Sequence, residues 1–199
     1  MSVLLAGALL MAVSGCTGSV DEPAPLPERS VGSAATLEAK PVPLDIEVEQ
    51  TIGPRMTPAE RRQLRDNVGR VVSGYLDAAY FGDYPRASFG AAFDRFSRGA
   101  ARRARSDREL LTNASVGRET ESVTPRKQQV RLFVLRDRRG TPGLTARIRV
   151  VFLQERAEGN DRRVLVTGRL LMDRADDGRW QVFGYDLARS DVPAGKGGQ

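Results

Sequence analysis

The period of the apolar residues changes once along the chain, near residue 115, and this change constrains the fold more than any other feature. From Thr57 to about residue 104, apolar side chains recur every three to four positions, as in a helix with one buried face. Beyond residue 115 they alternate with polar residues, as in half-buried strands. Helices followed by strands predict an α+β domain, with N-terminal helices packed on a curved antiparallel sheet.

The first helix is expected to begin at Thr57. The Thr57 side chain can accept a hydrogen bond from the backbone N–H of Glu60, and the Glu60 carboxylate can in turn accept one from the backbone N–H of Thr57. Pro58 suits the first helical turn. We expect this helix to end at the turn-forming residues 82–85.

A second helical stretch follows, with two distinct faces. The apolar face consists of Phe89, Phe93, Phe96, Ala100 and Ala104. The opposite face consists of four arginines, Arg95, Arg98, Arg102 and Arg105. We expect Gly99 to divide this stretch into two short helices.

Five strands are expected in the second half of the chain. Their ranges are 116–123, 128–138, 144–156, 162–174 and 179–188. Short connections rich in glycine and aspartate separate the later ones, so neighbouring strands should be antiparallel. A further short strand over 44–49 is compatible with the alternation of Leu44, Ile46 and Val48 with acidic residues.

The segment before the helices is poor in core-forming residues. Residues 17–55 contain six prolines and no aromatic side chain. We therefore expect a flexible, proline-rich, acidic tether over 16–55, a folded domain over 56–190 and a disordered tail over 191–199. Residues 16–50 contain seven acidic and two basic residues, so the net charge of +6 is concentrated in the folded domain.

The N-terminus carries a localisation signal. Residues 3–13 form an uncharged apolar run about half as long as a membrane-spanning helix. The following Val13-Ser14-Gly15-Cys16 resembles a bacterial lipobox. This resemblance implies a signal peptide over 1–15, cleavage before Cys16 and a diacylglycerol group on its sulfur. The product would be anchored by lipid at the extracytoplasmic face of the cell membrane. The alternative is a buried apolar segment with an incidental thiol.

Several classes of site are excluded by composition. The chain has no histidine and one cysteine, which excludes an internal disulfide framework, a Cys/His zinc site and imidazole-dependent catalysis. No glycine-rich nucleotide loop follows a strand, and the aspartates at 173, 176 and 177 lack the spacing of a calcium loop. We expect no cofactor, no metal and no catalytic residues.

Two short motifs suggest a family. Tyr-Phe-Gly-Asp-Tyr at 80–84 follows the first helix, and Asp-Gly-Arg-Trp-Gln-Val at 177–182 begins the last strand. With the order of elements, they resemble the nuclear transport factor 2-like, or cystatin-like, superfamily over residues 56–190. Within it, the chain is most similar to actinobacterial mammalian-cell-entry-associated envelope proteins. The resemblance implies a cone-shaped fold and a possible homodimer through the sheet. Some members are isomerases, dehydratases or cyclases, and others bind partners in transport or secretion assemblies.

A pocket inside such a cone has six candidate lining residues: Tyr75, Tyr80, Phe93, Phe133, Trp180 and Tyr185. Ordinary core packing explains the same pattern.

Among the acids, Asp83 suits a turn and Asp94 should pair with a nearby arginine. Asp186, expected on the strand face of Trp180, lies either inward or at the sheet edge. No acid–base pair stands out.

The arginines offer the clearest surface signal. Arg95, Arg98, Arg102 and Arg105 could contact phospholipid headgroups, wall polymers or an acidic protein, or could form a plain solvated face. Arg147 and Arg149 share one strand face, which is either solvent-exposed or inside the cone beside a buried acid. Nucleic acid is not expected, because no aromatic residues interleave the basic run.

The leading hypothesis is a non-enzymatic, membrane-anchored envelope lipoprotein that acts as an interaction module of a transport or secretion assembly. Its partners would be the membrane, through Cys16, and an envelope protein. The alternative is a protein that binds a hydrophobic small molecule, or a cyclase- or isomerase-like enzyme that uses the cone pocket.

Overall fold

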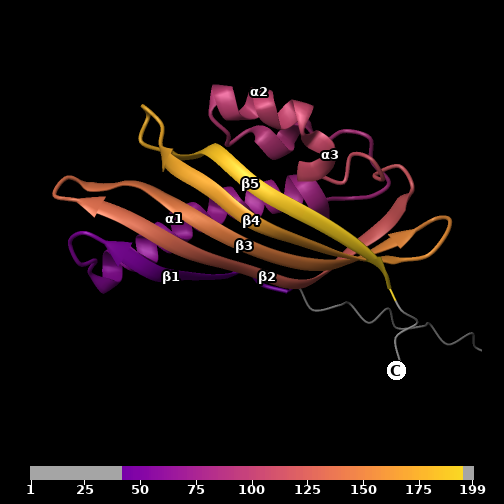
Figure 1. Cartoon of the computed structure of the whole chain (residues 1–199), viewed down its shortest axis with the longest axis horizontal. Coiled ribbons are helices and arrows are strands. Elements are labelled where there is room, and N and C mark those ends of the chain that lie inside the picture. The colour runs from indigo at the N-terminus through magenta and orange to yellow at the C-terminus, as the bar shows by residue number, and fades with distance from the viewer. Residues whose placement is uncertain (1–41, 195–199) are drawn as a thin grey trace, which may run out of the picture. The chain divides into compact units, whose positions relative to one another are not determined.

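In the described part of the chain, a five-stranded sheet has the helices packed on one face (Figure 1). The computed structural model describes residues 42–194, so the expected signal peptide, Cys16, the first part of the tether and the end of the tail lie outside the described residues. The elements in chain order are β1 (Asp45–Ile52), α1 (Pro58–Leu76), the π-helical turn η1 (Asp77–Phe81), the 3-10 turn η2 (Gly90–Phe93), α2 (Arg98–Ser106), α3 (Arg108–Leu111), β2 (Thr120–Asp137), β3 (Gly140–Arg156), β4 (Arg162–Arg174) and β5 (Trp180–Pro193).

The strand order in the sheet is the order in the chain, and the predicted α+β class is confirmed. β2 to β5 form an antiparallel meander, whereas β1 lies parallel to β2, so the sheet is mixed and not wholly antiparallel. A parallel pair needs a long crossover, and here the helical segments between β1 and β2 provide it.

The boundaries of the domain were predicted wrongly at both ends. β1 occupies Asp45–Ile52, so the end of the proposed 16–55 tether is a strand of the sheet. Its apolar residues Ile46 and Val48 pack against the core. At the other end β5 runs to Pro193, because residues 190–193 pair with β4; the proposed 191–199 tail therefore begins inside a strand.

The two strands expected at 116–123 and 128–138 are one strand, β2. The register shifts between Pro125 and Lys127, where the strand accommodates a proline that cannot donate a hydrogen bond. β1 pairs only with residues 129–135 of β2, so Pro125 lies on an edge that β1 does not reach.

The predicted start of α1 is confirmed. Glu60 donates its backbone N–H to the Thr57 Oγ1 at 3.2 Å, and Thr57 donates its own N–H to the Glu60 Oε2 at 2.7 Å. The helical segment ends at Gly82, whose N–H donates to the carbonyl of Asp77 at 2.7 Å.

The second helical stretch is interrupted at residues 94–97 and not at Gly99. Phe96 forms a parallel bridge with Val182 of β5, in which Val182 N–H donates to the Arg95 carbonyl and Ser97 N–H to the Val182 carbonyl, both at 2.8 Å. Ser97 then caps α2 by accepting the N–H of Ala100. Gly99 lies within the first turn of α2, because pairing with the sheet determines where the helix can begin.

The core lies between the helices and the inner face of the sheet. Tyr75, Tyr80 and Phe152 are among its largest fully buried side chains. The two tyrosine hydroxyls are 3.3 Å apart, and that of Tyr75 donates to the Leu111 carbonyl at 2.8 Å. Buried tyrosines need such partners, because an unpaired hydroxyl in the core is costly.

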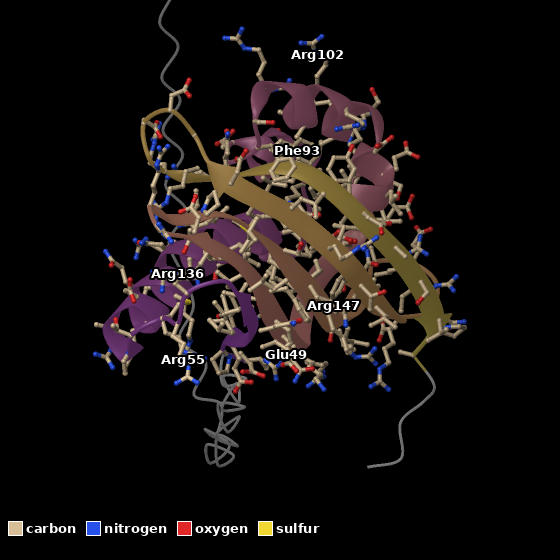
Figure 2. The ribbon with its side chains drawn as sticks, turned by 60° about the vertical axis from the view of Figure 1, so that its left-hand side comes forward. Glu49, Arg55, Phe93, Arg102, Arg136 and Arg147 are labelled. Atoms are coloured by element: carbon tan, nitrogen blue, oxygen red, sulfur yellow. The ribbon has the colours of Figure 1, made fainter. Side chains whose placement is uncertain are left out.

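The first turn of α1 is also bonded to the sheet, and this predicts a pH dependence. The Arg136 side chain of β2 donates to the Glu60 carboxylate at 2.8 Å and to the Arg55 carbonyl at 3.0 Å (Figure 2 labels both arginines). The bond from Arg136 is the main reason that the pKa of Glu60 falls from 4.5 to about 2.

We expect Glu60→Gln to destabilise the domain at neutral pH. Because the folded-state pKa is lowered, the contribution of the carboxylate is complete above pH 4.5 and is lost as the pH falls towards 2. Urea unfolding of both proteins should therefore give a difference in unfolding free energy at pH 7 that shrinks over this range. Glu109→Gln on α3, an exposed acid, is the control. A difference that does not change with pH would contradict the assignment.

Candidate functional site

A row of charged side chains crosses the free face of the sheet, with one residue from each strand. The register pairs Glu47 with Arg131, Arg131 with Arg147, Arg147 with Arg169, and Arg169 with Asp186. Strand alternation puts these residues on the face opposite the buried Leu132, Ile148 and Leu170. The row therefore places three arginines side by side between two acids.

Both ends of the row are neutralised. Arg131 lies 3.0 Å from Asp45, 3.6 Å from Glu47 and 4.0 Å from Glu49, all on β1. The hydrogen bond from Arg131 lowers the pKa of Asp45, and the same bond raises the pKa of Arg131. At the other end Arg169 lies 2.5 Å from Asp186.

The centre of the row is not neutralised. Within residues 42–194, neither Arg147 nor Arg149 forms an ion pair. The guanidinium of Arg147 lies 5.0 Å from the ring centroid of Phe133, a cation–π contact that orients the side chain without cancelling its charge. Like charges directly opposite each other on neighbouring strands are destabilising. The fold thus retains concentrated positive charge at the middle of the free face.

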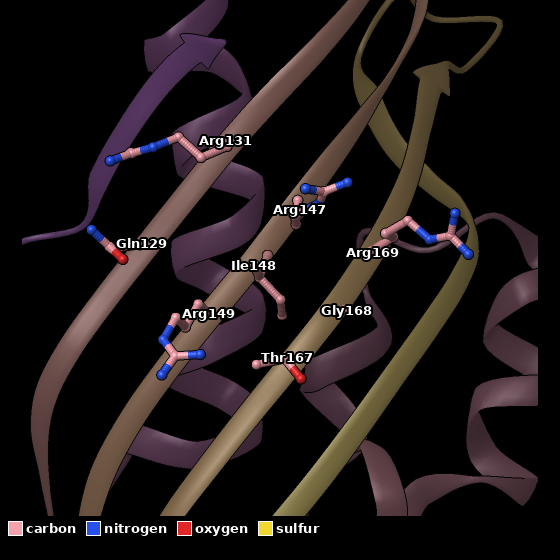
Figure 3. A pocket seen from close by; sticks show the side chains of 8 residues that line it. All are labelled: Gln129, Arg131, Arg147, Ile148, Arg149, Thr167, Gly168 and Arg169. Atoms are coloured by element: carbon pink, nitrogen blue, oxygen red, sulfur yellow. The ribbon is translucent and has the colours of Figure 1, made fainter.

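This charge surrounds a hollow of about 450 Å³ (Figure 3). Its lining consists of Gln129, Arg131, Arg147, Ile148, Arg149, Thr167, Gly168 and Arg169. Figure 3 looks onto the free face, with α1 behind the strands. Guanidinium groups offer planar pairs of N–H donors that match carboxylate and phosphate oxygens. The hollow can therefore bind an anion, and nothing in its lining supplies a general base.

Gly168 permits the close approach of β4 and β5 beside the hollow. Its φ is +137°, and a Cβ at this position would lie 2.0 Å from the Asp186 carbonyl oxygen. Any other residue would strain the backbone and displace the strand that carries Asp186, the partner of Arg169.

We expect Gly168→Ala to lower the free energy of unfolding by about 1–3 kcal/mol, because it adds both a positive-φ penalty and a backbone clash. Gly74→Ala in α1 is the matched control, because a Cβ there meets nothing within 4 Å. That control should be neutral or slightly stabilising. Urea unfolding measures both, and equal stabilities for the two variants would contradict the role of Gly168.

The four arginines predicted as an anion contact do not form one site. Arg98, Arg102 and Arg105 lie exposed on α2, and Arg102 projects into solvent in Figure 2. Arg95 precedes α2 and lines a different cavity, beside Trp180. Arg105 lines a third cleft with Phe93. The predicted stripe is divided because the bridge to β5 interrupts the helix.

The six residues predicted to line a cone pocket also fail to gather. Phe133 lies on the free face, away from the helices, because strand alternation puts it opposite Leu132 and Val134. Phe93 and Trp180 line separate cavities. Tyr185 donates its hydroxyl to Asp107 at 2.7 Å. Tyr75 and Tyr80 belong to the buried core.

Three of the tyrosines, Tyr75, Tyr80 and Tyr185, are held in their neutral form. Burial raises the pKa of Tyr75 well above its ordinary value and that of Tyr80 to about 12. Burial, reinforced by the bond to Asp107, raises the pKa of Tyr185 to about 12 as well. A phenolate base is therefore disfavoured at each of these positions.

The structure also shows where the charged residues Arg147, Arg149, Asp186 and Asp94 lie, positions that the sequence alone predicts or leaves open. Arg147 and Arg149 lie on the solvent side of the sheet and not inside it. Asp186 was expected on the face of Trp180, but a register shift in β5 between Val182 and Gly184 puts it on the free face. Asp94 is exposed and forms no ion pair with another described residue, contrary to expectation.

Sequence reasoning missed Arg131 and Arg169, which complete the row. Alternation with the buried Val130, Leu132 and Leu170 identifies the face of each. Their alignment with Arg147 depends on the register between strands, which no local pattern records.

In the described part of the chain, no cluster of acidic side chains could hold a metal ion. No helix there is long and apolar enough to cross a membrane. Comparisons of the chain with protein-family models, curated proteins and solved structures found no match.

Proposed function

We propose that this chain is a non-enzymatic envelope lipoprotein that docks an acidic segment of a partner protein on the free face of its sheet. The observation that carries the proposal is the row Arg131–Arg147–Arg169, whose centre has no carboxylate partner among the described residues. A binding surface of this kind supports an accessory role in a transport or secretion assembly, and not a reaction.

An acidic partner suits this face better than a second copy of the chain. A face-to-face dimer with its two-fold axis along the row would bring Arg147 against its own counterpart, and such like-charge contacts cost several kcal/mol. An extended acidic segment would instead bring carboxylates to Arg147 and Arg149. We therefore favour a heterologous partner over the homodimer through the sheet.

The proposed lipid anchor is compatible with such docking. Residues 17–44 separate Cys16 from β1. If they behave as a flexible coil, their root-mean-square reach is about 30 Å. A domain held in this way would meet partners in the membrane or close to it.

The superfamily resemblance remains part of the proposal. Helices that precede a meander of long strands, and that pack on one of its faces, support a nuclear transport factor 2-like fold. The kinship with mammalian-cell-entry-associated envelope proteins rests on the sequence resemblance alone. The alternative enzyme or carrier function has less support, because Tyr75 and Tyr80 are buried in the core and line none of the cavities described above.

Docking is tested by charge reversal on the free face. A photo-crosslinking residue in place of Thr145, beside the row, should capture an envelope protein in the native host, and Arg147→Glu with Arg149→Glu should reduce capture at least about tenfold. Arg102→Glu with Arg103→Glu on α2 is the matched control and should leave capture unchanged. A crosslink only to a second copy or to lipid, or one that survives the reversal on the free face, would contradict the proposal.

Anchoring is tested separately at Cys16. Intact-mass analysis should show a chain that begins at Cys16 and carries acyl groups, and Cys16→Ala should release the protein from the membrane fraction. The charge-reversed Arg147→Glu variant should stay in the membrane fraction, because lipid and not the sheet provides the anchor. An unacylated thiol on the full-length chain would contradict lipidation.

A further inference from the structure

A second basic cavity lies on the helix side of the domain, between α1 and the hairpin that joins β4 to β5. Its volume is about 270 Å³. Four arginines line it. Arg70 belongs to α1, Arg95 belongs to the segment 94–97 that pairs with β5, and Arg174 and Arg179 belong to the hairpin. Trp180, the first residue of β5, forms part of the wall.

The arginines of this cavity are held in place by neighbours that leave most of their charge uncancelled. The Arg174 guanidinium lies 4.9 Å from the Trp180 ring and donates to the Gly178 carbonyl at 2.8 Å. Arg70 donates to the side-chain oxygen of Asn67. These partners are a carbonyl, an amide and an aromatic ring, all uncharged, so they do not neutralise the positive charges of Arg174 and Arg70.

Only one carboxylate compensates these four groups within residues 42–194. Asp177 lies 2.5 Å from Arg179 and accepts a second bond from its Nε at 2.6 Å. Arg70, Arg95 and Arg174 form no ion pair with any described residue. Arg70, Arg95 and Arg174 therefore line a small volume without an ion-pair partner, although the charge of Arg95 also helps to lower the pKa of Asp177.

The wall also contains a buried donor without a partner. Trp180 is 4% exposed, and its indole Nε1–H has no acceptor among the described residues. Buried polar groups are rarely left unpaired, because folding removes their hydrogen bonds to water and an unpaired group gains no bond in exchange. Trp180 therefore adds a donor without an acceptor to a wall whose other polar groups are mainly guanidinium donors.

We propose that this cavity binds a phosphoryl group, either as free inorganic phosphate or as a phosphate monoester on a lipid headgroup. The cavity is smaller than the roughly 300–1,000 Å³ typical of sites for drug-sized ligands, which suits a compact anion. A phosphoryl dianion offers three acceptor oxygens, so several guanidinium forks can bind it together. The site is independent of the docking row, which lies on the other face of the sheet.

Trp180 is the only tryptophan of the chain, so its fluorescence reports on this cavity directly. In the full chain, titration with sodium phosphate at constant ionic strength should give a saturable change, and sodium chloride should not. Arg95→Gln and Arg70→Gln should each weaken the apparent affinity about tenfold or more. Arg105→Gln, an exposed arginine outside the cavity, should leave it unchanged.

Circular dichroism melting shows whether each variant is folded, and Arg95→Lys, which keeps the charge, should recover part of the affinity. A linear response that equals that of chloride would overturn the proposal. So would the same affinity in folded Arg95→Gln and Arg70→Gln as in the unaltered chain.

Vesicles distinguish the two sources of the phosphoryl group. Vesicles of phosphatidylcholine with phosphatidic acid present a phosphate monoester, whereas phosphatidylcholine alone does not. A saturable Trp180 response to both free phosphate and phosphatidic acid assigns the site to a headgroup, and a response to free phosphate alone assigns it to a soluble ligand. No saturable response to either probe would overturn the proposal. Loss of docking at Arg147 would leave all these measurements unaffected.

Discussion

The pairing of β1 with β2, in backbone register and through the acids around Arg131, is the interaction on which the charged free face depends. Arg131, Arg147 and Arg169 lie opposite one another and repel, and the row is tolerated because acidic residues of β1 and Asp186 of β5 flank it. β1 also begins the crossover that places α1 on the inner face, where Glu60 binds Arg136 of β2. Charge pairing therefore adds to the contacts of both β1 and α1 with β2, the first on the free face and the second on the inner face.

Local patterns were enough to predict the elements themselves. The capping box of Thr57 and Glu60 is visible in four consecutive residues, and the turn at Asp177-Gly178 is confirmed by a positive φ of 77° at the glycine. Alternation in β2 identifies Val130, Leu132 and Val134 as core residues. Each of these features depends on interactions within a few residues, so the amino-acid order contains the necessary information.

What could not be predicted depends on pairing between distant segments. One extra residue in β5 changes the face of every later side chain, which is why Asp186 was assigned to the wrong side. The bridge between Phe96 and Val182 decides where α2 begins, although Gly99 is the better local breaker. The arginine row needs two register relations at once, of β2 with β3 and of β3 with β4, and composition alone suggested only a basic surface.

The choice of arginine has a consequence for both proposed anion sites. The chain has no histidine, and guanidinium groups stay charged across the physiological range. Any change in anion affinity between pH 5 and 8 must then come mainly from the ligand. A phosphoryl group changes charge near pH 6, whereas a carboxylate stays ionised down to about pH 4. The pH dependence of binding thus distinguishes the two sites. Below about pH 6 the phosphoryl ligand of the Trp180 cavity would lose one of its two negative charges, whereas the carboxylate ligands of the row at Arg147 would stay ionised.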